Sequence, residues 1–327
     1  MRAARAIGAR QFEILDMDKP EPSDGQCLIK LERWSICGTD IRYSYGSSRT
    51  GEEFPGQPGG LCHEIAGTVA ESRNDKFSDG QRVIAIPSFD GPGGLVEYIV
   101  AEPGHLAKVP DEGDLTDWVM CQPAGTVLYG CKRVGTFLGQ RVLILGQGGI
   151  GLSFSAMCSR LGALQVIACD VLDYRLDCAR RFGATHVVNP ARDELDEAVS
   201  EITDGHMPDI TIEAAGYPDT LNDAFRLVRK YGKVVMFGIQ EGSKESDDAT
   251  LVRTSHLIRN EPTVIPCGAS GSGDPVGHVK EMVSLMERGW WNPGKLVTHH
   301  MKFNEVNDAY QMYEQRDDGV IKVVMST

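Results

Sequence analysis

A glycine-rich turn constrains this chain more than any other feature of its sequence. The run Gly146-Gln147-Gly148-Gly149-Ile150-Gly151 fits the pattern G-x-G-x-x-G, and it lies between an apolar segment at 141–145 and a helical pattern that continues to Leu161. Asp170 follows the next apolar segment, about 20 residues beyond the turn. A strand, a glycine turn, a helix and an acidic residue at this spacing predict a βαβ unit that binds a dinucleotide.

The dinucleotide interpretation gives each residue of this motif a physical role. Glycines let the backbone approach a pyrophosphate, whose charge the helix N-terminus stabilises. Asp170 would accept hydrogen bonds from the adenosine ribose hydroxyls and repel a 2′-phosphate, which predicts NAD rather than NADP. The alternative is a tight glycine turn followed by a solvated aspartate.

Strand and helix patterns alternate beyond the turn, whereas the first 120 residues contain short apolar runs separated by Gly, Pro and Asp. The alternation predicts an α/β fold with a doubly wound parallel sheet, and the short runs predict an irregular β domain. The polar stretch 240–250 predicts a surface loop. The expected strands are 141–145, 165–169, 186–188, 209–213 and 233–237, and the expected helices are 173–182, 193–203, 219–230 and 275–288.

Composition excludes several classes of protein. The 327 residues suggest two domains, and 33 Lys+Arg against 46 Asp+Glu give a net charge of −13. Such an acidic chain is not expected to bind nucleic acid or anionic membranes. No uncharged stretch is continuously apolar, and the basic start at 1–5 precedes no signal-peptide core. Nine dispersed Cys favour a reducing compartment, so we expect a cytoplasmic protein.

Two short segments of the first domain contain residue types that bind metals. They are Cys37-Gly38-Thr39-Asp40 and Cys62-His63-Glu64. Thiolate and imidazole suit zinc, and an acidic neighbour can orient a ligating His. Because buried Cys and hydrogen-bonded His are common in proteins without metals, these segments alone leave both interpretations open.

Taken together, these motifs resemble those of the zinc-dependent medium-chain dehydrogenases of the alcohol dehydrogenase superfamily. The resemblance covers nearly the whole chain and is closest to the polyol, sugar and threonine dehydrogenase branch. It implies a GroES-like β-rich catalytic domain formed by 1–125 and 266–327, and a Rossmann NAD-binding domain formed by 126–265. The matching segments are Cys37-Gly38-Thr39-Asp40, His63 to Gly67, Gly80-Gln81-Arg82-Val83, the turn at Gly146, Leu296 to His299 and Ile321 to Val324.

The resemblance also implies roles for individual residues. Cys37 and His63 match zinc ligands, Gln122 occupies the third ligand position, and Glu64 matches a neighbour that moves on and off the metal. Thr39 matches the hydroxyl that relays the alcohol proton. The cofactor residues implied are Gly146, Gly148, Gly149, Ile150, Gly151, Asp170, Arg175, Gly238 and Lys322, of which Lys322 matches a basic residue that meets the pyrophosphate.

Departures from the family pattern concern the metal site. Gln122 replaces the usual Glu or Cys, and a neutral amide is a weaker ligand that leaves zinc with one thiolate at a net charge of about +1. Sugar dehydrogenases resembling glucose dehydrogenase also carry Gln at this position, and Cys121 is an alternative ligand. Cys62 stands where the family usually has Gly. The chain passes from Pro87 to Leu95 without the four-Cys lobe, so we expect one catalytic zinc and no structural zinc.

Arg42 replaces a His that often ends the proton relay. A guanidinium stays protonated and cannot act as a base, so the proton must leave through water. Arg42 is instead a candidate for binding an anionic or polyhydroxylated substrate, the alternative being a surface ion pair.

The sequence therefore predicts hydride transfer between a secondary, polyol- or sugar-like alcohol and NAD, with zinc as Lewis acid. Two alternatives remain open at this stage: a zinc-free NAD(P)H-dependent reductase of the same superfamily, and a non-catalytic NAD-binding protein. By resemblance, the chain is expected to form a homodimer or homotetramer.

Overall fold

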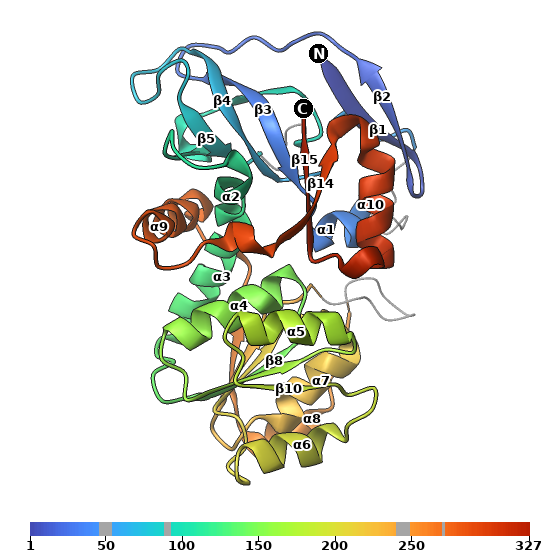
Figure 1. Cartoon of the computed structure of the whole chain (residues 1–327), viewed down its shortest axis with the longest axis vertical. Coiled ribbons are helices and arrows are strands. Elements are labelled where there is room, and N and C mark those ends of the chain that lie inside the picture. Colours follow the sequence, from blue (N-terminus) through green and yellow to red (C-terminus); the bar gives the residue numbers. More distant parts are fainter. Residues whose placement is uncertain (46–53, 88–92, 240–248, 270–271) are drawn as a thin grey trace. The chain divides into compact units, whose positions relative to one another are not determined.

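The structure of the chain is a computed structural model that describes residues 1–45, 54–87, 93–239, 249–269 and 272–327 (Figure 1). It divides into two compact units. Unit 1 comprises Met1–Gly125 and Asp274–Thr327, and unit 2 comprises Thr126–Gly273. The second segment of unit 1 thus begins further along the chain than the boundary expected at residue 266. Of the loop expected at 240–250, only residues 249 and 250 are described.

Unit 2 contains a six-stranded parallel sheet with the order β10-β9-β8-β11-β12-β13. The chain order reverses between the neighbouring strands β8 and β11, and in such sheets ligands bind beside the carboxyl ends of the strands at this reversal. The predicted doubly wound sheet is confirmed. The strands are β8 (Arg141–Leu145), β9 (Gln165–Cys169), β10 (His186–Val188), β11 (Ile210–Glu213), β12 (Lys233–Met236) and β13 (Thr263–Pro266).

Helices cover both faces of this sheet (Figure 1). Alternate residues Leu143 and Leu145 of β8 point to the face covered by α6 and α7, where Val199, Leu221 and Phe225 pack against them in one apolar cluster. Because both faces are covered, the strands are apolar throughout rather than alternating. The helices of unit 2 are α4 (Gly149–Arg160), α5 (Asp173–Arg181), α6 (Leu195–Ile202), α7 (Pro218–Leu227) and α8 (Thr254–Asn260).

Unit 1 contains a mixed sheet with the order β14-β15-β3-β4-β5-β7, in which β6 also pairs with β3. A separate hairpin, β1 (Arg2–Gly8) with β2 (Gln11–Asp16), completes the β structure. The C-terminal strands join strands from the first segment, so unit 1 is formed by both ends of the chain. The sheet strands are β3 (Cys27–Ser35), β4 (Glu64–Ser72), β5 (Arg82–Ala85), β6 (Tyr98–Ala101), β7 (Leu106–Lys108), β14 (Val297–Lys302) and β15 (Lys322–Ser326).

The register of three neighbouring strands positions the candidate site. Ser35 at the end of β3 pairs with Glu64 at the start of β4 and with Val324 of β15. The residues that follow Ser35 and precede Glu64 therefore emerge at the same place on the sheet.

Several helical elements pack against the strands of unit 1. Trp34, Phe303 and Tyr310 are buried in its apolar core, and the Trp34 indole donates a hydrogen bond to the Gly94 carbonyl at 2.7 Å. α3 (Cys121–Val134) begins in unit 1 and continues into unit 2. The other helical elements are α1 (Gly38–Asp40), η1 (Ile41–Tyr45), η2 (Pro103–His105), α2 (Leu115–Val119), α9 (Pro275–Glu287), η4 (Pro293–Leu296), η5 (Phe303–Glu305), α10 (Val306–Gln315) and η6 (Asp317–Gly319).

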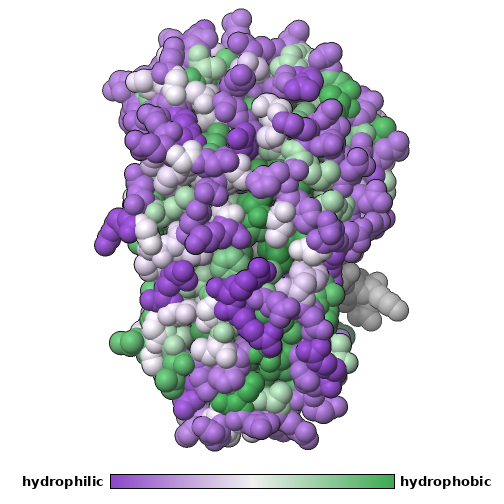
Figure 2. All heavy atoms as spheres, in the orientation of Figure 1, coloured by the Kyte–Doolittle hydropathy of each residue, from purple (hydrophilic) through white to green (hydrophobic). Residues whose placement is uncertain are grey.

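Hydrophilic residues cover most of the face shown in Figure 2, with apolar residues scattered between them. Among the described residues, no helix combines the length and the apolar character that a membrane-spanning helix requires.

Candidate metal centre and dinucleotide site

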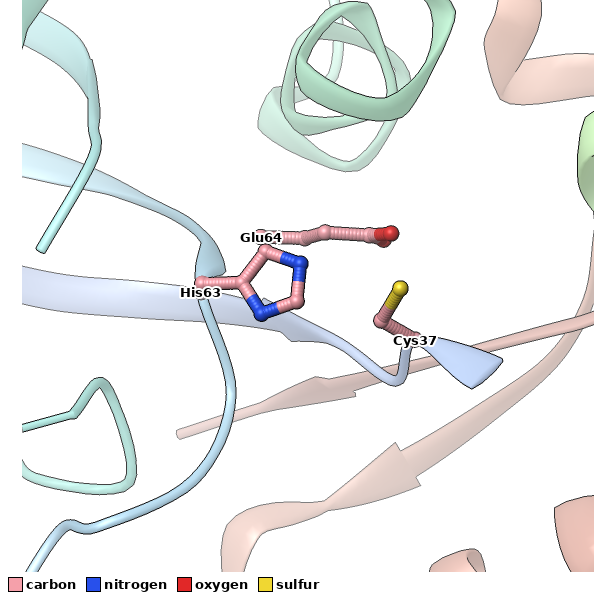
Figure 3. Close-up of side chains that lie close together, drawn as sticks. All are labelled: Cys37, His63 and Glu64. Atoms are coloured by element: carbon pink, nitrogen blue, oxygen red, sulfur yellow. The ribbon is translucent and has the colours of Figure 1, made fainter. Parts of the chain in front are cut away.

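Three side chains of unit 1 meet at the end of the β3–β4 pair. One potential ligand atom each from Cys37, His63 and Glu64 lies within 4.8 Å of the others (Figure 3). Cys37 precedes the short helix α1, and Glu64 is the first residue of β4. The sulfur, imidazole and carboxylate point toward a common space, which is a donor set suited to zinc.

Asp40 holds the two ligand-bearing segments together. Its buried carboxylate accepts hydrogen bonds from the backbone N–H of Cys37 at 3.0 Å and of Cys62 at 3.3 Å. The other side-chain contacts of Asp40 are the Tyr310 hydroxyl, which donates at 3.4 Å, and Nδ1 of His63, which lies 3.6 Å from Oδ1. The Asp40 carboxylate therefore lies beside Nδ1 of the His63 ring, the place from which carboxylates orient ligating histidines at many metal sites.

The charged groups around His63 favour the positively charged form of its imidazole. Desolvation lowers the pKa of His63, but the nearby Cys37 sulfur and Asp40 carboxylate outweigh it and raise the pKa well above its ordinary value. The negative groups around His63 thus favour positive charge at this place, whether a proton or a metal ion supplies it.

Glu64 is held by two donors. Ser35 Oγ and Lys322 Nζ each lie 2.5 Å from Glu64 Oε2, and Lys322 Nζ also donates to the Ile36 carbonyl at 2.6 Å. Burial lowers the pKa of Lys322, but the charge of Glu64 outweighs it and raises the pKa. This ammonium is engaged inside unit 1, and its expected contact with a cofactor pyrophosphate stays a prediction.

Thr39 and Gln122 each present a buried oxygen that lacks a hydrogen-bond partner in the described part of the chain. Gln122 is the second residue of α3 and follows Met120 by two positions. The Met120 sulfur lies 3.6 Å from Ser35 Oγ, which in turn contacts Glu64. Unpartnered buried oxygens are costly, and a metal ion or a substrate hydroxyl would satisfy them. The cluster of Cys37, His63 and Glu64 fits a zinc site, and the predicted roles of Thr39 and Gln122 beside it stay predictions.

The two thiols next to the candidate ligands in the sequence, Cys62 and Cys121, are both buried. Cys121 Sγ lies 3.6 Å from the Met286 sulfur, and burial raises the pKa of Cys121. Cys62 is buried with φ of 67°, a left-handed conformation that explains why a glycine suits this position. Its sulfur lies 3.4 Å from the Ser35 carbonyl, and burial raises the pKa of Cys62 well above its ordinary value. In the structure both sulfur atoms pack against other groups of unit 1.

Arg42 is the second residue of the π-helical turn η1 and is partly exposed. Its role toward a substrate stays a prediction.

In unit 2, the glycine-rich turn joins β8 to α4. Gly146 adopts φ of 92°, and a Cβ atom at Gly151 would lie 1.8 Å from the Gly146 carbonyl oxygen, so both positions require glycine. Gly148 is the N-cap of α4, and Gly149 and Ile150 form its first turn. Among the described residues, a Cβ atom at Gly148 would meet Arg175 Nη1 alone, at 4.0 Å, which leaves space beside this helix N-terminus.

Asp170 supports the glycine-rich turn. Its carboxylate accepts hydrogen bonds from the N–H of Gln147 at 2.7 Å and of Leu172 at 3.0 Å, and Arg175 Nη1 lies 3.7 Å away. The sequence did not reveal this structural role, which comes in addition to the predicted ribose contact.

Gly238 lies near the carboxyl ends of β11 and β12. A Cβ atom there would lie 2.5 Å from Glu213 Oε2. Glu213 is buried, and its Oε1 accepts hydrogen bonds from the N–H of Gly216 at 2.6 Å and the hydroxyl of Thr220 at 2.8 Å. Gly238 thus keeps the chain close to Glu213 at the edge of the sheet where ligands bind.

Comparison with known proteins identifies the family. The model described as "Alcohol dehydrogenase GroES-like domain" matches residues 23–111, and the model described as "Zinc-binding dehydrogenase" matches residues 149–288. Together they cover more than half of the chain, which therefore belongs to the zinc-type medium-chain dehydrogenases. The family and the fold class expected from the sequence are both confirmed.

Individual relatives extend over nearly the whole chain. A sorbitol dehydrogenase of Bombyx mori is 28% identical, covering 95% of this chain and 94% of the relative. An L-threonine 3-dehydrogenase of Shewanella halifaxensis is 27% identical, covering 96% and 95%. The crystal structure of an Escherichia coli oxidoreductase/dehydrogenase of unknown specificity, involved in membrane biogenesis, matches with a TM-score of 0.87 at 26% identity, covering 100% of this chain and 99% of that one.

Proposed function

We propose that the chain is a zinc- and NAD-dependent dehydrogenase that oxidises a secondary alcohol of the polyol or sugar type. The observation that carries the proposal is the cluster of Cys37, His63 and Glu64 in a chain whose other unit contains the glycine-rich turn. The names of the relatives, which include sorbitol and L-threonine 3-dehydrogenases, support this substrate class.

Cys37 and His63 are the two principal zinc ligands in this proposal, and Gln122 supplies a neutral third ligand. Asp40 orients His63, and the unpartnered Gln122 oxygen gains a partner. A zinc ion held there supplies a Lewis acid for the alcohol oxygen. Gln122 is neutral, so the ligand set carries less negative charge than it would with a carboxylate at position 122. The zinc ion would therefore be a stronger Lewis acid.

Thr39 carries the proton. Its buried hydroxyl accepts the alcohol proton and passes it to water, because Arg42 stays protonated and cannot be the next base. Arg42, on the adjacent turn, binds hydroxyl or anionic groups of the substrate.

Unit 2 holds the cofactor. Gly148 and the N-terminus of α4 bind the pyrophosphate. Asp170 and Arg175 lie beside the adenosine ribose. Gly238, which has no side chain, leaves room for the cofactor at the carboxyl ends of the strands. Bound NAD would supply a hydride acceptor for the alcohol carbon, and the product would be a ketone. The chain is further proposed to act as a homo-oligomer, on family resemblance alone.

The experiment is a screen of zinc-loaded protein with polyols and sugars, in which NADH formation is followed by its absorbance. We expect turnover of at least one polyol or sugar, and Thr39→Val should lower kcat about 100-fold while it retains zinc. Absence of NAD-linked alcohol oxidation by zinc-loaded protein would contradict the proposal. Reduction of enones or quinones by NAD(P)H that survives chelation would instead favour a zinc-free reductase.

A further inference from the structure

Lys322 joins the two segments that carry the metal cluster. Its Nζ contacts Oε2 of Glu64, at the start of β4, and the carbonyl oxygen of Ile36, next to Cys37 after β3. The antiparallel pairing of β15 with β3 brings Lys322 there, since Ile36 N–H bonds to the Val323 carbonyl at 3.1 Å.

This ion pair is fully inside the protein. The exposed fractions are 4% for the Lys322 side chain and 1% for that of Glu64. Removing two charges from water is costly, and an apolar pair of similar volume stabilises a fold about as well as a buried ion pair does. A gain in folding stability therefore does not explain why this ion pair is buried. Its position beside Cys37 and His63 indicates a role at the proposed metal site.

Glu64 is the carboxylate that could occupy the remaining ligand position of a metal bound by Cys37 and His63. One of its oxygens lies within 4.8 Å of the Cys37 sulfur and a His63 nitrogen, yet Oε2 is already bound by Lys322 and Ser35. A carboxylate in contact with an ammonium is a weaker ligand, because the metal must compete with the lysine for its charge.

We propose that Lys322 is a positioning residue that holds the Glu64 carboxylate off the metal and so keeps one ligand position open for the substrate. This inference rests on the proposed zinc site. An open position distinguishes catalytic zinc sites from closed structural ones.

Removal of the ammonium should therefore strengthen zinc binding. In Lys322→Met, Glu64 is a buried carboxylate with Ser35 as its remaining donor, and zinc becomes the cation that compensates its charge. A lysine with a purely structural role would lower the melting temperature on mutation without any gain in zinc affinity.

The experiment measures zinc affinity of the metal-free full chain by competition with a chromogenic chelator, together with the rise in melting temperature on adding zinc. The variants are Lys322→Met, Lys322→Gln, which keeps amide donors without the charge, and the double variant Lys322→Met with Glu64→Gln. Lys302→Met serves as the matched control, because Lys302 lies exposed on the adjacent strand β14 and donates to Thr327.

We expect both single variants to bind zinc about 10- to 100-fold more tightly than the wild type and to gain more in melting temperature from it. The double variant should lose this gain, and Lys302→Met should match the wild type. A single variant that folds only when zinc is supplied, while the double variant folds without it, would also support the proposal.

Zinc affinity in both single variants that is lower than in the wild type, or within twofold of it, would overturn this role of Lys322 while leaving the proposed function intact. Failure of the wild type itself to bind zinc would overturn the proposed function and, with it, this inference.

Discussion

At the scale of single residues, Gln122 sets the charge of the proposed metal centre. A neutral amide beside one thiolate leaves zinc more positive than a second anionic ligand would. Gln122→Glu should raise zinc affinity about tenfold or more and lower kcat, because a less positive zinc stabilises an alkoxide less. Chelator competition and kcat on the best alcohol substrate measure both effects. Zinc affinity unchanged by the substitution would show that position 122 is not a ligand.

Glu97 provides a residue-scale prediction about pH. Burial raises the pKa of Glu97, but hydrogen bonds from the Arg2 N–H and guanidinium, both at 2.7 Å, outweigh it and lower the pKa from its usual 4.5. A lowered pKa stabilises the fold above pH 4.5, and this stabilisation is lost as pH falls through the folded-state value.

Glu97→Gln should therefore lower the melting temperature by about 2 °C at pH 7 and by less as the pH falls below 4.5. Scanning calorimetry of both proteins between pH 3 and pH 7 tests this. A difference that is constant over that range would mean that the charge of Glu97 contributes nothing.

The sequence revealed those site residues that belong to short, contiguous motifs. Cys37, His63 and Glu64 were predicted to lie together, and the structure brings them within 4.8 Å. The partnership of Lys322 with Glu64 was not predicted, because 258 positions separate them and only the β15–β3–β4 register brings them together. The hydrogen bonds of Asp170 to the glycine turn were missed for a similar reason.

At the scale of elements, apolar runs and glycine turns predicted unit 2 well. The strands expected at 141–145 and 165–169 are β8 and β9, and the helix expected at 275–288 is α9, at Pro275–Glu287. Helix α3 was not predicted, because Pro123, Gly125 and Gly130 interrupt its pattern and most of its residues are buried, which leaves no polar face to mark a helix.

The glycine-rich turn gives a prediction with a matched control. Gly151→Ala should destabilise unit 2 by about 3 kcal/mol, because its Cβ would lie 1.8 Å from the Gly146 carbonyl oxygen. In Gly148→Ala the new Cβ meets Arg175 alone among the described residues, at 4.0 Å, so the change should alter stability by less than about 0.5 kcal/mol while weakening NAD binding about tenfold. Urea unfolding and NAD titration separate the two effects. Equal NAD affinity in Gly148→Ala and the wild type would contradict the proposed pyrophosphate site.

At the scale of the whole molecule, the proposed metal centre draws on distant parts of the chain. Cys37 and His63 come from the first segment of unit 1, Gln122 from the point where that segment ends, and Lys322 from the last strand. Family resemblance predicted that both chain ends share one domain, whereas local patterns do not reveal such long-range pairing.

The measurement that tests the central claim most directly is the zinc content per chain of protein purified without chelators, compared with Cys37→Ser. The account predicts about one zinc per chain in the wild type and a large loss in the variant, because thiolate is the strongest ligand of the proposed set. A wild-type protein without zinc, even after zinc is supplied, would contradict it, as would a Cys37→Ser protein that keeps its full zinc content.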